Sequence, residues 1–333
     1  MNSDSFDALV SLLSGHKVYL QTHDFPDPDA IASAVGLQKL LKWKGIDAEV
    51  CYFGRIEKSN TKMIVEHFHL DVRDASELEN LSEEDYVVTV DGQKSNSNFS
   101  ELTGREVACI DHHPWTTEYA YEFVKHKITG ACATIVTKWI KNAGMPLERE
   151  LATLLLYGIK MDTRSFSFGV SEDDIEAFAF LNRYVDSEFI RFLDNSVLEL
   201  TDLRAYGAAI ESIRIYDDVG FAYIPFECPD GLIASVCEFI LSLAVVQVAI
   251  VYAERSGNLK FSVRSETSEL NAGRFINRAL DGIGSGGGHF SMAGGVVFAE
   301  KRSLLGEKER MEFALHERFL KVYREMEEEQ NHV

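Results

Sequence analysis

The sequence predicts an α/β protein: an N-terminal, mostly parallel sheet with helices on both faces, followed by a smaller C-terminal α/β domain. Two observations carry this prediction. Short, continuous apolar runs alternate with segments of helical periodicity through the first half of the 333-residue chain, as strands buried on both faces require. Beyond about residue 215, a second series of strand-like runs appears with helical segments between them. The length leaves room for two domains.

The first half reads as four strands with intervening helices. The apolar runs at 17–22, 48–53, 86–90 and 107–110 are the predicted strands. Residues 29–44 form a predicted helix, because apolar side chains such as Ala34, Leu37 and Leu41 recur at helical spacing. Further helices are expected at 128–142 and 149–160, and residues 170–212 are mostly helical and charged.

The second half contains strand-like runs at 220–225, 245–253, 259–263 and 295–299. Helices are expected at 232–243 and 270–279, and a charged amphipathic helix is expected from Gly306 onward. We therefore predict a first domain at 1–190, a helical linker at 191–215 and a second domain at 216–333 that contains a Gly-rich loop.

Composition excludes several classes of protein. The net charge of −20 argues against binding to long duplex nucleic acid, which needs a basic surface. No run of about 18 apolar residues is present, and the acidic N-terminus lacks a secretory signal, so we expect no membrane partner. The five cysteines are widely spaced and include no CxxC pair, which indicates a reducing cytoplasm without disulfides or a thiolate zinc site.

Four segments carry candidate metal ligands. They are His23–Asp29, Asp91, Asp111–His113 and Asp162–Arg164. Three of them follow predicted strands directly, and the carboxyl ends of parallel strands meet at the ligand-binding edge of a sheet. Carboxylates and imidazoles without thiolates suit Mn²⁺ or Mg²⁺. Two such ions about 3.5–4 Å apart can clamp the attacking and leaving oxygens of phosphoryl transfer.

Each segment also has a simpler interpretation. Asp91 before Gly92 is typical of a turn, and Asp27 and Asp29 can supply a turn and a helix N-cap. His112 and His113 can be a satisfied polar pair, and Asp162 can merely end its helix. The simpler interpretations must each hold separately for the four segments, and they leave several buried charges at strand ends uncompensated. A single metal site formed by all four segments is therefore the favoured interpretation.

A fifth candidate segment lies in the second half. Glycines let a backbone approach a ligand closely, and successive N–H groups can hold an anion. The segment is Gly284-Ser285-Gly286-Gly287-Gly288-His289, and Arg264-Ser265 ends a predicted strand nearby. Arg264 offers a planar fork to phosphate or carboxylate. The alternatives are a flexible turn and an ordinary surface arginine.

Taken in order, the fragments H-D-F-P-D-P-D-A, V-V-T-V-D, I-D-H-H-P, Y-G-I-K-M-D-T, S-V-R-S and G-G-G-H resemble the DHH phosphoesterase superfamily with its DHH-associated C-terminal domain. The resemblance runs from His23 to about Phe298. It is strongest to the cytosolic branch that degrades very short oligonucleotides, as an oligoribonuclease-like exonuclease, and dephosphorylates 3′-phosphoadenosine 5′-phosphate.

The resemblance implies a catalytic first domain with two divalent ions, Mn²⁺ or alternatively Mg²⁺, and a substrate-binding second domain, with the active site in the cleft between them. It implies one ion on His23, Asp27 and Asp91, and the other on Asp29, Asp91, His112 and Asp162. His113 would then contact the substrate, and Asp111 would orient an imidazole. The implied substrate-binding residues are Arg264, Ser265, Gly286, Gly287, Gly288 and His289.

Two features depart from the usual pattern. Pro28 stands between the carboxylates of the first motif, and the residues after Asp91 lack the arginine often found there in the oligoribonuclease branch, for which Lys94 is a candidate substitute. The leading hypothesis is a Mn²⁺-dependent phosphoesterase acting on short oligonucleotides, linear dinucleotides or nucleoside bisphosphates. An exopolyphosphatase or pyrophosphatase, and a nucleotide-sensing binding protein, are the alternatives. The helical tail and linker are compatible with a homodimer.

Overall fold

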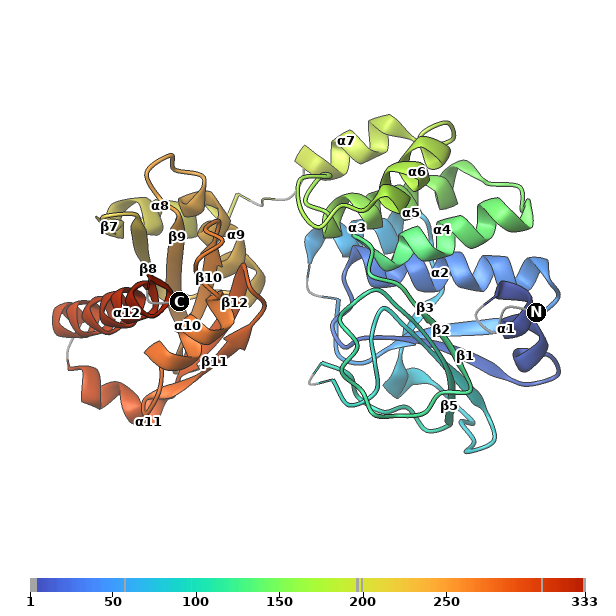
Figure 1. The fold of residues 1–333 in the computed structure, drawn as a ribbon, viewed down its shortest axis with the longest axis horizontal. Helices are drawn as coiled ribbons and strands as arrows, with labels where there is room; N and C mark the ends of the chain where they lie inside the picture. The colour runs from blue at the N-terminus through green and yellow to red at the C-terminus, as the bar shows by residue number, and fades with distance from the viewer. Residues whose placement is uncertain are drawn as a thin grey trace. The chain divides into compact units, whose positions relative to one another are not determined.

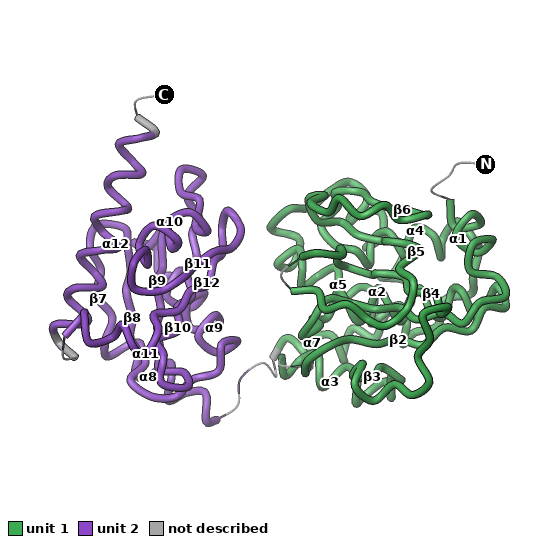
Figure 2. Tube along the Cα trace, turned by 90° about the horizontal axis from the view of Figure 1, so that it is seen from below, with its two compact units in different colours: residues 1–197 green, residues 198–333 purple. Residues whose placement is uncertain are grey.

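The computed structural model describes residues 5–56, 58–96, 98–195, 198, 200–306 and 308–331, and the chain divides into two compact units, 1–197 and 198–333 (Figures 1 and 2). The division falls inside the segment 191–215, for which a linker is predicted. Helix α8 (Leu203–Ser212) lies in this segment, and its Ala205 and Ala209 belong to a hydrophobic core of the second unit. Part of the predicted linker is therefore an integral helix of that unit.

The first unit contains a six-stranded sheet in the order β3-β2-β1-β4-β5-β6, and every neighbouring pair is parallel. The strands are β1 (Val18–Thr22), β2 (Ala48–Tyr52), β3 (Val72–Asp74), β4 (Tyr86–Val90), β5 (Arg105–Asp111) and β6 (Phe123–His126). The strand order reverses direction between β1 and β4. Ligand sites of open parallel sheets lie at the carboxyl ends of strands beside such a switch point.

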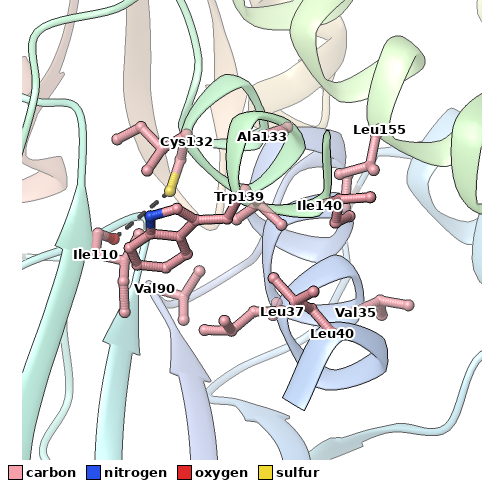
Figure 3. Close-up of a cluster of buried hydrophobic side chains, with 14 of the residues drawn as sticks. Val35, Leu37, Leu40, Val90, Ile110, Cys132, Ala133, Trp139, Ile140 and Leu155 are labelled. Carbon is pink, nitrogen blue, oxygen red and sulfur yellow. Dashed lines mark hydrogen bonds between the residues drawn. The ribbon is translucent and has the colours of Figure 1, made fainter. Parts of the chain in front are cut away.

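Helices cover one face of this sheet (Figure 1). They are α1 (Phe6–Leu13), α2 (Pro28–Trp43), α3 (Ser59–His67), α4 (Cys132–Ala143), α5 (Arg149–Asp162), α6 (Glu172–Leu181) and α7 (Ser187–Asn195). Figure 3 shows side chains of α2 and α4 converging on Val90 and Ile110 at the ends of β4 and β5. Helix α2 packs closely between its neighbours, since a Cβ at Gly36 would lie 3.0 Å from both Val136 and Leu155.

The other face of the sheet is covered differently from the prediction of helices on both faces. Its hydrophobic cluster consists of Tyr19, Cys51, Ala75, Val87 and Leu102, and among the described residues it contains none from an α-helix. A 3₁₀ turn, η1 (Ala75–Glu77), and loop segments supply the cover instead. Continuous apolar strands indicate burial on both sides but do not say what buries them.

The second unit is built on a mixed sheet in the order β11-β12-β10-β9-β8-β7, in which β8 and β9 are parallel. The strands are β7 (Arg214–Tyr216), β8 (Val219–Glu227), β9 (Val248–Arg255), β10 (Asn258–Ser265), β11 (Gly284–Gly288) and β12 (Met292–Val297). One face packs on α8 and α9 (Asp230–Leu241), and the other on α10 (Ala272–Ala279) and α12 (Lys308–Asn331). The remaining elements are α11 (Ala299–Arg302) and the 3₁₀ turn η2 (Ser303–Leu305). None of the helices in the described ranges has the length and apolar character needed to span a bilayer.

The Gly-rich segment is not the loop that the sequence predicts. Gly284–Gly288 forms the edge strand β11, paired antiparallel with β12. The glycines are needed for this close pairing, because a Cβ at Gly284 would lie 1.9 Å from the Val296 carbonyl oxygen and one at Gly286 would lie 2.9 Å from Ile276 of α10. Glycine has a low propensity for strands, so the sequence shows no sign of β11. The close contacts with β12 and α10, which only glycine allows, determine it instead.

Replacing Leu155 by Ala should lower the free energy of unfolding of the first unit by about 2–5 kcal/mol, because it opens a cavity between α2 and α5. Leu155 is fully buried. Urea denaturation followed by circular dichroism measures the change. The control is Ile175→Ala, since Ile175 of α6 is 51% exposed and its loss should cost less than about 0.5 kcal/mol. Equal losses in the two variants would contradict this packing.

Candidate metal centre

The candidate ligands of the first unit gather into three groups at the carboxyl ends of β1, β4 and β5. In each group, one ligand atom per residue lies within 4.8 Å of the others. The groups are His23–Asp27–Asp91, Asp29–His112–Asp162 and Asp91–His112–His113. Every metal ligand named by the sequence analysis is included. Asp91 belongs to the first and third groups, and the third group shares His112 with the second. The Asp91 carboxylate therefore lies between the two candidate ion positions, as a carboxylate shared by two cations must.

Asp91 occupies the turn that directly follows β4. Its φ of 59° lies in the left-handed region, which Asp tolerates better than most residues, and its N–H donates to the Ile110 carbonyl oxygen. Oδ2 lies 3.8 Å from His23 Nε2, and Oδ1 lies 3.4 Å from His112 Nε2. Oδ1 is buried and has no hydrogen-bond partner among the described residues, so it is free to bind a cation.

His112 is oriented by the backbone. Its Nδ1 donates to the Thr129 carbonyl oxygen at 2.9 Å, which leaves the lone pair of the neutral ring on Nε2. Nε2 lies 3.2 Å from Asp162 Oδ2, at the last residue of α5, yet within the described residues it makes no well-formed hydrogen bond. A buried imidazole nitrogen facing carboxylates with its lone pair fits a divalent ion.

Asp27 combines the two roles that the sequence analysis treats as alternatives. It is the N-cap of α2, with Oδ1 accepting hydrogen bonds from the N–H groups of Asp29 and Ala30, and it also belongs to a candidate ligand group. Pro28 takes the first helical position, where it costs no hydrogen bond. Burial opposes ionisation of Asp27, but Lys58, His23 and the two amides outweigh it and lower its pKa.

Asp29 connects the site to a second helix. Oδ2 accepts from the Cys132 N–H at 2.7 Å and Oδ1 from the Ala133 N–H at 3.0 Å, so Asp29 caps α4, whose own N-cap residue is Ala131. Burial and the charges of Asp91 and Asp162 nevertheless raise the pKa of Asp29 well above its usual value. The positive charge of a protonated His112 opposes this shift without cancelling it.

The whole cluster has more buried negative charge than its surroundings compensate. Burial raises the pKa of Asp91 to about 7, although His112 and His113 oppose the shift. The pKa of His112 rises well above its usual value: burial favours the neutral ring, but Asp162, Asp91 and Asp29 attract its proton more strongly. Divalent cations would replace these protons, and the donor set of carboxylates and imidazoles fits Mn²⁺ or Mg²⁺.

Asp111 orients His113 rather than the metal-ligand candidate His112. Asp111 Oδ1 accepts from His113 Nδ1 at 2.9 Å, and Oδ2 accepts from Gln93 Nε2 at 2.6 Å. Gln93 is fully buried and also bonds the Pro114 carbonyl oxygen and the Thr116 N–H. The sequence analysis missed Gln93, because a neutral amide two residues after Asp91 carries no motif.

Lys94 does not take the place of the expected arginine. Its Nζ lies 2.5 Å from Glu106 Oε2 and 3.5 Å from Glu101 Oε2, and it sits over the Tyr119 ring. Glu106 belongs to the amino-terminal half of β5, whereas the candidate ligands follow its carboxyl end. Two carboxylates and an aromatic ring therefore hold the ammonium group away from the metal centre.

The predicted substrate residues of the second unit lie at one end of its sheet but face different ways. Arg264 pairs with Met292 and Gly288 with Ala293, which brings the ends of β10 and β11 near the same turn. The Arg264 guanidinium points toward α9, with Nε 3.3 Å from Glu238 Oε1. Ser265 is buried and His289 is exposed.

Gly286, Gly287 and Gly288 instead line a pocket of about 620 Å³ with α10 and α12. The other lining residues are Asn271, Gly273, Arg274, Asn277, Arg278, Met326 and Glu329. Arg264, Ser265 and His289 are not among them. Asn277 Nδ2 donates to the Gly286 carbonyl oxygen, and Arg278 makes two hydrogen bonds to Glu329. Arg274 and Arg278 lie one helical turn apart, a spacing that any amphipathic helix can show, so the sequence analysis missed them.

Comparison with known proteins identifies two conserved domain types. The DHH family, N-terminal domain, matches residues 17–159, and the DHHA1 domain matches residues 217–314. An uncharacterized protein of Methanocaldococcus jannaschii is 26% identical over 92% of this chain and 64% of its own length. A Bacillus licheniformis protein named "Probable manganese-dependent inorganic pyrophosphatase" is 30% identical over 48% of this chain and 53% of its own length. The chain thus spans between half and two thirds of these relatives.

Two solved structures share the fold. An exopolyphosphatase-related protein from Bacteroides fragilis superimposes with a TM-score of 0.77, with 18% identity and 96% of each chain covered. The exonuclease RecJ bound to manganese gives a TM-score of 0.51, with 16% identity, covering 95% of this chain and 93% of that one. At these identities the similarity extends to the fold alone.

Replacing Asp91 by Ala should reduce bound Mn²⁺ from two ions to fewer than two per chain, because both candidate ion positions share this carboxylate. Isothermal titration calorimetry and elemental analysis measure the stoichiometry. The matched control is Asp24→Asn: Asp24 neighbours His23 in sequence, but its carboxylate bonds Ser100 and lies outside the ligand groups. Two tightly bound ions in the Asp91 variant would rule out the shared role.

Mn²⁺ affinity should fall as the pH is lowered from about 8 to about 6. The pKa of Asp91 is about 7 without metal, and those of Asp29 and His112 are raised, so the cluster holds protons that an ion must displace. Calorimetry in two buffers of different ionisation enthalpy measures the protons released. Affinity independent of pH, without proton release, would contradict the charge balance described above.

Proposed function

The chain belongs to the DHH phosphoesterase superfamily, and we propose that it is a metal-dependent hydrolase of short oligonucleotides, linear dinucleotides or nucleoside 3′,5′-bisphosphates. The observation that carries the proposal is the sharing of Asp91 between two groups of metal-ligand candidates. A pair of cations around one carboxylate is suited to phosphoester hydrolysis. The activity is proposed for the two domains present in this chain, which span between half and two thirds of the length of its relatives.

We propose that His23, Asp27 and Asp91 hold one divalent ion and that Asp29, Asp91, His112 and Asp162 hold the other. Mn²⁺ is the preferred ion and Mg²⁺ the alternative. When bound, such ions polarise a phosphoryl oxygen and lower the pKa of water. The carboxylate of Asp29, fixed by two amides of α4, and the ring of His112, fixed by Thr129, keep their ligand atoms in place for this purpose.

His113 is the residue best suited to act on the substrate itself. Its Nδ1–H donates to Asp111, whose own pKa is lowered by hydrogen bonds from His113 and Gln93 despite burial. The pKa of His113 rises to about 9: burial opposes the proton, but Asp111 and Asp91 hold it. The hydrogen bond to Asp111 favours the protonated ring, whose Nε2–H can donate to a phosphate oxygen or to the leaving oxygen.

The pocket of the second unit is proposed to bind a phosphate remote from the bond that is cleaved. It offers two guanidinium groups and the backbone of three successive glycines, in a chain whose net charge is −20. Arg264, Ser265 and His289 stay candidates for the same role at the neighbouring end of the sheet. Closure of the two units around the substrate stays a prediction of the sequence analysis.

Hydrolysis of inorganic pyrophosphate or polyphosphate is the second candidate function. The names of a relative and of a structural neighbour favour it, and it would use the same metal centre. The pocket in the second unit argues for a substrate with few phosphates, since Glu329 already neutralises one of its two arginines. A nucleotide-binding protein without turnover is the non-enzymatic alternative.

The deciding experiment is an assay of the full chain with Mn²⁺ against a 5′-labelled dinucleotide, longer oligonucleotides, adenosine 3′,5′-bisphosphate, pyrophosphate and polyphosphate. We expect mononucleotide release from the dinucleotide or phosphate release from the bisphosphate. Turnover of only pyrophosphate or polyphosphate would establish the second candidate. Tight nucleotide binding by metal-loaded protein without any hydrolysis would establish the binding protein.

Replacing Asp111 by Asn should shift the alkaline limb of the pH–rate profile to lower pH. The carboxylate raises the pKa of His113, and a proton donor is active only below its pKa, so loss of the carboxylate removes the active form earlier as pH rises. Steady-state rates across the pH range measure the shift, with metal content checked in parallel. An unchanged profile with full metal loading would exclude His113 as the proton donor.

Replacing Arg274 by Ala should raise KM for the nucleotide about tenfold while leaving bound Mn²⁺ unchanged, because a charged hydrogen bond to phosphate is lost. Arg310→Ala is the control, since Arg310 is an exposed arginine of α12 outside the pocket lining. Steady-state kinetics and elemental analysis separate the two effects. Loss of metal, or an equal KM change in both variants, would contradict a phosphate-binding role of the pocket.

A further inference from the structure

We propose that Phe25 and Trp115, two exposed aromatic residues on the loops that carry the candidate metal ligands, stack against the bases of a nucleotide substrate. The inference rests on the proposed function and names residues that would select nucleotides over inorganic phosphates. It is drawn from the positions of the two rings, their exposure and the contacts that fix their loops.

Phe25 lies between two candidate ligands, His23 and Asp27, and 54% of its surface is exposed. Its φ of 54° is left-handed, a conformation that costs energy for a residue with a side chain and that is concentrated at functional sites. Its N–H donates to the Phe53 carbonyl oxygen, and its ring lies so close to Gly54 that a Cβ there would come within 2.7 Å of it. The ring is therefore held against backbone on one side and open to solvent on another.

Trp115 follows His113 by two residues and is 39% exposed. Its ring makes T-shaped contacts with Tyr121 and His126, which fix its orientation. The loop is also tied down on both sides of Trp115, because buried Gln93 bonds the carbonyl oxygen of Pro114 and the N–H of Thr116. The same Gln93 side chain donates to Asp111, so one buried amide positions both the exposed ring and the residue that orients His113.

The sheet order places the two rings on opposite sides of the metal centre. Phe25 follows β1 and bonds to the chain just after β2, and Trp115 follows β5 and contacts His126 of β6. Strands β1, β4 and β5, which carry the candidate ligands, are adjacent in the order β2-β1-β4-β5-β6. Neighbouring strands lie about 4.8 Å apart, so the rings flank the centre at distances that nucleosides on either side of a phosphate can span.

Stacking on aromatic rings suits a short substrate of mixed sequence, because every base has a π face and no specific base edge need be read. It also suits a protein with a net charge of −20, which gains little from general attraction to phosphates. Single exposed aromatic residues are common on protein surfaces. Phe25 and Trp115, however, are both fixed by contacts and both lie within two residues of candidate catalytic groups. A flat, apolar ligand explains this pair better than chance exposure does.

The kinetic test compares a dinucleotide with inorganic pyrophosphate, which has no base. Trp115→Ala and Phe25→Ala should each raise KM for the dinucleotide about tenfold, with a smaller change in kcat, and leave KM for any pyrophosphate turnover unchanged. Trp115→Phe should restore most of the dinucleotide KM. The matched control is Trp43→Ala, because Trp43 is 45% exposed but ends α2, remote in sequence from the ligand loops.

Tryptophan fluorescence supplies a readout that does not depend on activity. Trp139 is buried, so in a Trp43→Phe background Trp115 is the only exposed tryptophan of the described chain. Adenosine 5′-monophosphate added to Mg²⁺-loaded protein should quench this emission, inorganic phosphate should not, and Trp115→Ala should abolish the response. The proposal would be overturned if inorganic phosphate quenched the emission as strongly as adenosine 5′-monophosphate does. It would also be overturned if the KM for the dinucleotide were unchanged in both alanine variants.

The two proposals fail in distinguishable ways. If the wild-type chain hydrolyses none of the phosphate compounds, the proposed function fails, and nucleotide-specific quenching would still support stacking at Trp115. If the chain hydrolyses dinucleotides at a KM that neither aromatic residue affects, the function stands and the stacking proposal is wrong.

Discussion

The carboxylate of Asp29 is the contact on which the candidate site most depends. It belongs to α2, yet it accepts the first free N–H groups of α4, so one side chain joins two helices that are far apart in sequence. The start of α4 is also tied to the sheet, because the Cys132 thiol donates to the Ile110 carbonyl oxygen at the end of β5 (Figure 3). The chain just before α4 then presents the Thr129 carbonyl oxygen to His112. A displacement of α4 would therefore disturb a ligand, its orienting partner and the strand end together.

This arrangement sets function against stability. A carboxylate whose pKa is raised in the folded state is charged more easily in the unfolded chain, so Asp29 and Asp91 destabilise the folded state at neutral pH. Bound cations would reverse that effect, because they favour the ionised carboxylates and bind only the folded cluster. The large apolar core around α2, α4 and α5 is what allows the first unit to hold this charge at its switch point.

The sequence predicts the clustering of the candidate ligands better than the hydrogen-bond network around them, for physical reasons. Asp91 and His112 can be recognised because strand ends of a parallel sheet converge, so their spacing along the chain is informative. The partners Gln93 and Thr129 act through an amide and a backbone carbonyl, which leave no trace in residue type. Strand β11 was hidden because its glycines follow from close contact with α10 and β12, a property of the assembled unit. The loops that cover the helix-free face of the first unit's sheet were missed for the same reason.

Strand β11 is central to the proposal that the pocket of the second unit binds a phosphate with few basic residues. An edge strand normally exposes its N–H and C=O groups to unwanted pairing. Here Asn277 bonds the Gly286 carbonyl oxygen, and Gly273 lets α10 approach so closely that a Cβ on it would lie 2.4 Å from the Gly288 oxygen. In an antiparallel strand the N–H and C=O of one residue point to the same side, so the Gly286 N–H faces the helix and pocket side of the edge as well. Backbone donors and Arg274, the arginine of the pocket that does not pair with Glu329 by hydrogen bonds, suit a single phosphate group, whereas the net charge of −20 opposes a long polyanion. The proposed preference for short substrates rests on the same net charge that argues against binding to long duplex nucleic acid.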